Sequence, residues 1–166
     1  MCRGWTFAVM FAFVALGCGA ATDSGTQAAE DVGGSGAVKP ALPYAASVES
    51  FSPGEGAGYG SEDFPGVVLG PPDGGGVAKA GLDVLTLGAG GSIVLAFGDR
   101  SIVDGEGADF VVFENPFYIN GNREQLYREL GEVAVSRDGE EWRSFDCEPE
   151  AGGELRWPGC AGWTPT

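Results

Sequence analysis

The chain of 166 residues contains no histidine, and it has only 9 basic side chains against 24 acidic ones. Without histidine it cannot build a Ser-His-Asp or Cys-His catalytic group or a histidine-ligated zinc site. The formal net charge of −15 argues against a nucleic-acid groove, because neutralising phosphates requires clustered lysine and arginine. The cation that suits the remaining side chains is a hard ion such as calcium, which binds carboxylate and carbonyl oxygens.

Long apolar runs are also scarce. A run at residues 5–16 follows the basic residue Arg3, and it is shorter than the about 20 residues that span a bilayer core. A basic start, a short apolar run and a small residue before the cleavage point are typical of a secretory signal peptide. We therefore assign residues 1–17 to a signal peptide, with a buried N-terminal helix as the alternative.

The residues at the expected cleavage point, Val-Ala-Leu-Gly-Cys at 14–18, resemble the lipobox of bacterial lipoproteins. In that family the peptide is cut before the cysteine, which receives diacylglycerol on its sulfur and an acyl chain on its amino group. The resemblance implies a lipid on Cys18 and anchorage to a membrane, with ordinary signal cleavage as the alternative. Gly19 lies where the family's sorting rule places aspartate for retention in the inner membrane. The expected location is therefore the outer membrane or the cell surface.

The segment after the cysteine, residues 19–42, consists mainly of alanine, glycine, serine and threonine. Such a composition buries too little apolar surface to order a chain. We expect residues 18–42 to form a lipidated cysteine and a flexible tether that spans roughly 25 to 30 Å. Residues 43–166 are then one folded domain.

The four cysteines divide between these parts. Cys2 leaves with the signal peptide and Cys18 takes the lipid, so Cys147 and Cys160 remain as an even pair in an exported chain. We predict a disulfide between these two residues, since two thiols alone cannot make a zinc site.

From residue 43 onward, short apolar runs alternate with glycine, proline and aspartate. Strands at intervals of about ten residues with turns between them favour a mainly β fold, as an antiparallel β-sandwich or jelly roll. The apolar run at 110–113 predicts a central strand covered on both faces, and residues 122–130 predict a short helix. The expected strands are 46–51, 84–87, 92–97, 109–114, 132–136 and 142–145.

The clearest hairpin signal is Asp138-Gly139, which lies between two alternating apolar segments. Glycine adopts positive φ at such a turn without a side-chain clash. The pattern V-x-V-S-x-D-G-x-x-W at 133–142 resembles the hairpin of discoidin-like, galactose-binding-type β-sandwiches, in which a strand ends in serine, turns at Asp-Gly and returns through a buried tryptophan. The resemblance implies that fold and says little about the ligand.

A wider resemblance covers most of residues 44–163. Its most distinctive segment is Asp-Gly-Glu-Gly-Ala-Asp-Phe-Val-Val-Phe-Glu-Asn at 104–115, which is similar to the D-G-x-G-x-D-F-x-V-F-E-N segment of an uncharacterised group of bacterial cell-surface proteins and lipoproteins. That group continues beyond the Cys-Ala-Gly-Trp segment at 160–163 into further strands. The resemblance implies a surface location and a sandwich that is incomplete at its C-terminus, with an unpaired sheet edge.

The same segment supplies candidate metal ligands. Asp104, Glu106 and Asp109 place three carboxylates around two glycines. Calcium accepts about six to eight oxygen ligands, including the backbone carbonyls that a glycine loop presents. We predict a structural calcium site at these three residues, with a solvated acidic turn as the alternative. The glycine clusters at 54–60 and 88–91 lack the order of a phosphate-binding loop and are expected to be turns.

Tyr118, Trp157 and Trp163 lie in loop-like regions, where their rings are able to stack on sugar faces, with packing inside the protein as the alternative. We expect a lipid-anchored envelope protein that acts as a non-catalytic binding module for a glycan or a protein. The alternatives are a structural envelope lipoprotein without a small ligand and a paired-carboxylate glycosidase. The glycosidase needs two acids about 5 to 9.5 Å apart, whereas Asp109 and Glu114 on one regular strand would be roughly 17 Å apart.

Overall fold

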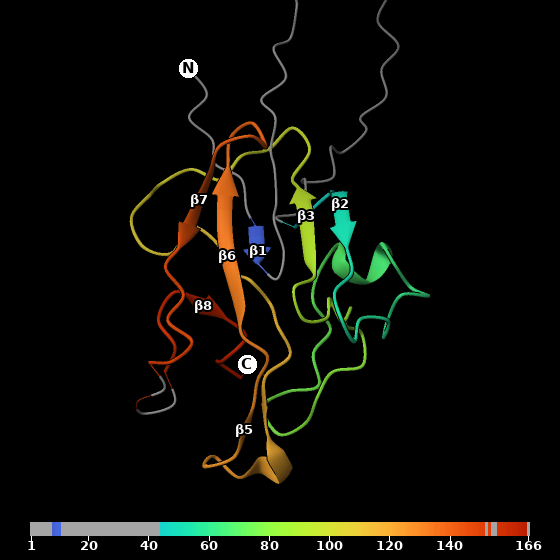
Figure 1. The fold of residues 1–166 in the computed structure, drawn as a ribbon, viewed down its shortest axis with the longest axis vertical. Helices are drawn as coiled ribbons and strands as arrows, with labels where there is room; N and C mark the ends of the chain where they lie inside the picture. Colours follow the sequence, from blue (N-terminus) through green and yellow to red (C-terminus); the bar gives the residue numbers. More distant parts are fainter. Residues whose placement is uncertain (1–7, 11–43, 152, 154–155, 166) are drawn as a thin grey trace, which may run out of the picture.

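The structure is a computed structural model that describes residues 8–10, 44–151, 153 and 156–165. Its larger sheet has six strands in the order β2-β3-β1-β6-β7, with β8 also paired to β6 (Figure 1). The strands of this sheet are β1 Ala8–Met10, β2 Ser47–Ser52, β3 Ser92–Ala96, β6 Gly131–Ser136, β7 Trp142–Phe145 and β8 Cys160–Ala161. The second sheet consists of β4 Phe117–Tyr118 and β5 Leu126–Tyr127, and short 3₁₀ helices lie at η1 Gly66–Val68 and η2 Ile119–Gly121.

The described strands pair in antiparallel fashion throughout, and helix is confined to single turns. The predicted mainly β class is therefore confirmed. The two-layer sandwich stays a prediction, because the second sheet in the described part of the chain has just two short strands. Neither of these sheets closes into a barrel.

Strand β6 is the centre of the larger sheet. Val133, Ala134 and Val135 are 6%, 0% and 7% exposed, so side chains on both of its faces are buried. One edge of β6 pairs with β1, and the other edge pairs with β8 at 131–132 and with β7 at 133–136. A strand that is covered on both faces requires a continuous apolar sequence, which this segment has. The partly buried apolar residues around it are Val94, Leu95, Phe97, Ile102, Phe110, Val112, Trp142 and Ala161.

The strand predicted at 109–114 is wrong, because this segment is an extended loop. Phe110 and Val112 pack against the core around β6, and the Phe110 ring meets the Phe145 ring of β7 edge-on with centroids 5.5 Å apart. Val111 and Phe113 point away from that core and are 67% and 54% exposed. The whole run lines an open cavity, and Phe110 and Val112 also contact the core, which accounts for apolar side chains on both sides of the run.

The other predicted elements are tested by the backbone hydrogen bonds that their residues make. The strands predicted at 46–51, 92–97, 132–136 and 142–145 correspond to β2, β3, β6 and β7 and are confirmed. The helix predicted at 122–130 is wrong. Residues 117–127 instead fold back as a hairpin, in which Tyr118 is paired with Leu126 and Phe117 with Tyr127.

The strand predicted at 84–87 is also wrong, and the glycine clusters supply the reason. The Gly54 N–H donates to the Leu87 carbonyl at 2.8 Å, while Glu55 and Ala89 exchange two backbone bonds of 3.1 and 2.8 Å. A β-carbon at position 54 would collide with the facing backbone, so only glycine permits this approach. The clusters are turns, as predicted, and they also hold 84–87 by isolated bonds in place of a strand ladder.

The β6–β7 hairpin forms as predicted, and side chains close its turn. The Ser136 hydroxyl oxygen accepts the N–H of Gly139 at 2.8 Å, and Gly139 has a φ of 80°. The Asp138 carboxylate accepts the N–H groups of Glu140 and Glu141 at 2.9 Å each. These bonds, with that from Glu141 the largest cause and that from Glu140 next, hold the pKa of Asp138 below its ordinary value.

The predicted disulfide between Cys147 and Cys160 is present. Cys147 follows β7, and Cys160 begins β8, so the bond joins two strands that share one edge of β6. Cys160 is 9% exposed, and the neighbouring Trp157 is 2% exposed. The disulfide therefore ties the short strand β8 to the core of the sheet.

Removing this bond should destabilise the fold. The double variant C147S/C160S should lose about 3 kcal/mol of unfolding free energy, because a loop of this size no longer restricts the unfolded chain. Urea unfolding followed by tryptophan fluorescence measures the change. Wild-type protein in reductant is the matched control and should unfold at the same urea concentration as the variant. Unchanged unfolding midpoints would contradict a stabilising role.

Candidate functional site

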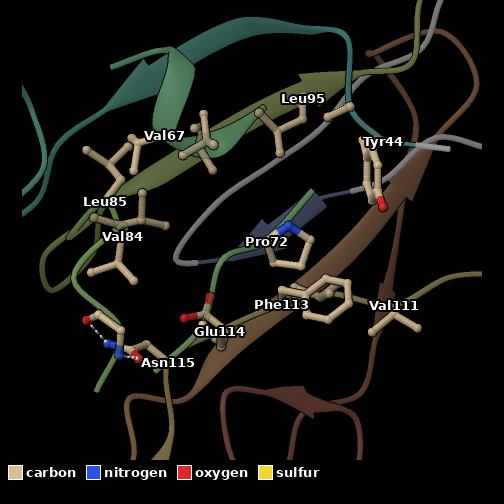
Figure 2. Close-up of a pocket in the computed structure, with 18 of the residues that line it drawn as sticks. Tyr44, Val67, Pro72, Val84, Leu85, Leu95, Val111, Phe113, Glu114 and Asn115 are labelled. Carbon is tan, nitrogen blue, oxygen red and sulfur yellow. Dashed lines mark hydrogen bonds between the residues drawn. The ribbon is translucent and has the colours of Figure 1, made fainter. Parts of the chain in front are cut away.

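A cavity of about 1710 Å³ lies against the larger sheet on the side of β3. Ile93 and Leu95 of β3 contribute to its lining, and its walls include residues 70–76, 83–89 and 108–116. Figure 2 shows Leu95 on one side of the cavity and Phe113 on the other. The site is thus built by β3, by the start of β6 at Gly131 and by loops that the glycine turns hold in place.

Apolar side chains dominate the exposed wall of the cavity. Val103, Val111 and Phe113 are 62%, 67% and 54% exposed, and all three line it. Val111 and Phe113 project into the open space from the 109–114 loop (Figure 2). Exposed apolar side chains that line one cavity are typical of interaction sites.

Glu114 is the acidic group at the inner end of this wall, and its carboxyl group points into the cavity (Figure 2). By accessible surface the Glu114 side chain is exposed, because it opens onto the cavity. Protein atoms nevertheless surround the carboxyl group as densely as at an interior position. The surrounding protein raises the pKa of the Glu114 carboxyl group. Solvent in the cavity screens this group, so its contribution to the free energy of unfolding is smaller but has the same sign.

The pKa of Glu114 rises from 4.5 to about 7. Burial is the largest cause because it penalises the charged carboxylate, and the negative charge of Glu129 adds to the rise. A hydrogen bond from the backbone N–H of Asn115 acts in the opposite direction. Near neutral pH the Glu114 carboxyl group is therefore only partly ionised.

Asn115 joins two walls of the cavity. Its Oδ1 accepts the N–H of Gly81 at 2.8 Å, and its Nδ2 donates to the carbonyl of Gly81 at 3.3 Å (Figure 2). Nearby, the Asp83 carboxylate accepts the N–H of Asp73 at 3.0 Å. These side-chain bonds replace the strand ladder that the loops lack, and they fix the 73–83 segment opposite the 109–115 loop.

Two arginines at the rim have defined partners. The Arg100 guanidinium donates to the carbonyl of Tyr44 at 2.9 Å. The Arg128 guanidinium lies 4.0 Å from the centroid of the Trp157 ring, within the range of a cation–π contact. Both arginines line the cavity, so its charge is mixed rather than purely acidic.

The structure places the predicted calcium ligands on an exposed turn. The Asp109 carboxylate accepts the N–H of Gly105 at 2.8 Å, while Asp104 and Glu106 are exposed. Among the described residues, no group of three or more acidic or cysteine side chains is placed to hold a metal ion. Calcium binding stays a prediction, and the geometry here is that of the alternative, an acidic turn.

The three aromatic residues predicted to stack on a sugar do not lie on one surface: Trp157 and Trp163 are in contact, and Tyr118 belongs to the second sheet. Trp157 is 2% exposed, so its ring is not available for stacking on a sugar. Trp163 packs edge-on against Trp157 at 6.4 Å and donates its indole N–H to the carbonyl of Cys160 at 2.9 Å. Tyr118 belongs to β4 of the second sheet, where the Arg123 guanidinium lies 5.7 Å from its ring centroid. Glycan binding through these residues stays a prediction.

Cys18, the predicted lipidation site, lies outside the described residues. Within the described part of the chain, no helix is long and apolar enough to cross a membrane. The lipid anchor and the outer-membrane or surface location therefore stay predictions that come from the sequence.

Glu114 and Asn115 were not among the predicted site residues. Their signal in the sequence is a charged and an amide side chain directly after a fully apolar run, which marks the point where a buried segment meets a polar environment. Comparisons with protein-family models, with curated proteins and with solved structures gave no match. Function is therefore inferred from the cavity and its side chains.

The raised pKa of Glu114 predicts a pH dependence of stability. Between pH 4.5 and about 7 the folded chain retains a proton that the unfolded chain has lost. The contribution of this group is therefore full below the lower value and is lost as pH rises toward the upper one. The variant E114Q should lose this dependence, as measured by urea unfolding midpoints across that range.

The control for this experiment is E106Q, the same change on the exposed acidic turn. Its midpoints should follow those of the wild type at every pH. A difference between E114Q and the wild type that stays constant from pH 4.5 to 8 would show that the pKa of Glu114 is not raised.

Replacing Asn115 should loosen the cavity wall. The variant N115A removes both bonds to Gly81 and leaves a buried N–H without its partner, which costs about 1–3 kcal/mol. Faster hydrogen exchange of residues 73–83 is the expected local result. N115D keeps one acceptor for the Gly81 N–H and should show an intermediate effect, whereas unchanged exchange in both variants would contradict the clamp.

Proposed function

We propose that this protein is an envelope surface protein, anchored by a lipid on Cys18, that acts as a non-catalytic binding module. The observation that supports this function is the cavity of about 1710 Å³ with its apolar walls. Ligand sites are typically concave and mostly apolar, with a few polar groups that fix orientation. Glu114 and Asn115 supply those polar groups.

Between the two expected ligand classes, the cavity favours a protein. A sugar site needs exposed ring faces and many hydrogen-bonding groups, whereas Val103, Val111 and Phe113 present aliphatic side chains and a single ring. The volume also exceeds the about 300–1,000 Å³ that is usual for small-molecule sites. An apolar surface of an envelope polypeptide matches both features.

The test uses the protein as isolated from the envelope of cells that produce it. A photo-reactive residue replaces Phe113 in the cavity or, as the matched control, Glu49 on the exposed face of β2. We expect a cross-linked polypeptide at position 113 and none at position 49. Equal cross-linking at both positions, or selective retention of a polysaccharide instead, would contradict a protein-binding cavity.

Truncating the exposed wall should weaken this interaction without unfolding the domain. F113A should reduce affinity for the cross-linked partner about tenfold or more, because burying such a ring contributes about 1.5–3 kcal/mol. Phe113 is 54% exposed in the free protein, so its urea unfolding midpoint should change little. An unaltered affinity, measured by calorimetry, would remove Phe113 from the binding surface.

A pair of carboxylates favours a second candidate function. Glu114 has a pKa near 7, raised by burial and by the charge of Glu129, and both residues line the cavity. Glycosidases use two acids that flank the scissile bond, one of which has a raised pKa and donates the proton. Hydrolysis of a polysaccharide that is lost in both E114Q and E129Q would establish this activity in place of the binding function.

A further inference from the structure

A strand from the expected signal peptide occupies the middle of the larger sheet. Strand β1 lies between β3 and β6 and pairs with both (Figure 1). Val9 is level with Ile93 on one side and with Val133 on the other. Because β1 is antiparallel to each neighbour, β3 and β6 run parallel to one another with one strand between them.

Removal of residues 1–17 would leave a slot between the two strands. Their facing edges would lie roughly 9–10 Å apart, which is two interstrand spacings. With β1 in place, both flanks belong to the best-buried part of the described chain, since Ile93 is 5% exposed and Ala134 is 0% exposed. Backbone N–H and C=O groups at such a position require partners.

The outer edges of β3 and β6 are already paired with other described strands. The other edge of β3 pairs with β2, and the other edge of β6 pairs with β7 and β8. Closing the slot would move β3 and β6 together by about 4.8 Å while each stays tied to its outer neighbours. Ile93 and Gly131 also line the cavity, so the slot and the cavity adjoin.

We propose that, once the signal peptide is removed, this slot accepts an extended apolar strand of a partner polypeptide, antiparallel to β3 and β6. The proposal rests on the proposed binding function and names the chemistry of the partner. Backbone pairing on both sides excludes proline from the inserted strand, because proline has no N–H to donate. The occupant in this structure, Ala-Val-Met at 8–10, meets that requirement.

A different polypeptide fits the slot better than the other sources of a strand. A second copy of this chain loses its own residues 8–10 with its signal peptide. The tether at 19–42 has few large apolar side chains to cover Ile93 and Ala134. Strand addition by a partner supplies both backbone bonds and apolar cover.

The test measures hydrogen exchange in the mature protein extracted from the envelope in detergent, with its N-terminus established by mass spectrometry. The probe is a peptide with the sequence of residues 5–13, flanked by lysines for solubility. We expect it to slow exchange of the amides in β3 and β6 that face the slot by at least about tenfold. The matched control peptide carries V9P and should give no protection. Because only the peptide is altered, misfolding of the protein cannot produce the difference.

A photo-reactive group at peptide position 8 fixes the register and should label Val94 or Ala134. Three results would overturn the proposal: no protection by the peptide, equal protection by the V9P peptide, or slot amides already protected in a mature chain that carries no other polypeptide. Retention of residues 5–13 in the mature chain would overturn it as well. Cross-linking at position 113 without protection by the peptide would support the binding cavity and reject the strand slot. Protection by the peptide without cross-linking at position 113 would support the slot and reject the cavity as the binding site.

Discussion

Backbone pairing along both edges of β6 is the interaction on which the rest of the structure depends. Its consecutive residues Val133, Ala134 and Val135 are buried on both faces, so every polar group of its backbone needs a partner in the sheet. Strands β7 and β8 supply those partners on one edge and β1 on the other. The disulfide secures β8, and the core residues of β3 complete the same layer.

The loops that pack over this sheet are held by isolated hydrogen bonds rather than by strand pairing. The 109–114 loop lines the cavity and also contacts the core through Phe110 and Val112, and Asn115 ties its end to Gly81. The glycine clusters bring 54–55 and 87–89 into backbone contact. Isolated bonds of this kind leave more open space than a paired second sheet would, which explains how a small β domain contains so large a cavity. The apolar loop and the carboxyl group of Glu114 then share one site.

Much of the fold was predictable because period-two patterns and turn chemistry are local. The strands β2, β3, β6 and β7, the Asp-Gly hairpin and the disulfide all follow from short segments or from counting cysteines. The helix predicted at 122–130 is wrong because Leu126 and Tyr127, whose spacing from Leu130 suits a helix, pair instead with Tyr118 and Phe117. The errors at 84–87 and 109–114 share another cause. An apolar segment is equally suited to a strand interior and to a loop wedged against a sheet, and only the partner of its backbone separates the two.

The sequence by itself determined the absence of histidine chemistry, the acidic charge, the export and lipid-anchor expectation and the mainly β class, because each depends on composition or on neighbours along the chain. Only the tertiary structure decided that β6 takes the central position, that Trp157 is buried, and that Glu114 faces a cavity beside Glu129. It also showed that β1, Ala8–Met10, lies between β3 and β6. These features arise from contacts between residues far apart in the chain, which no local pattern specifies.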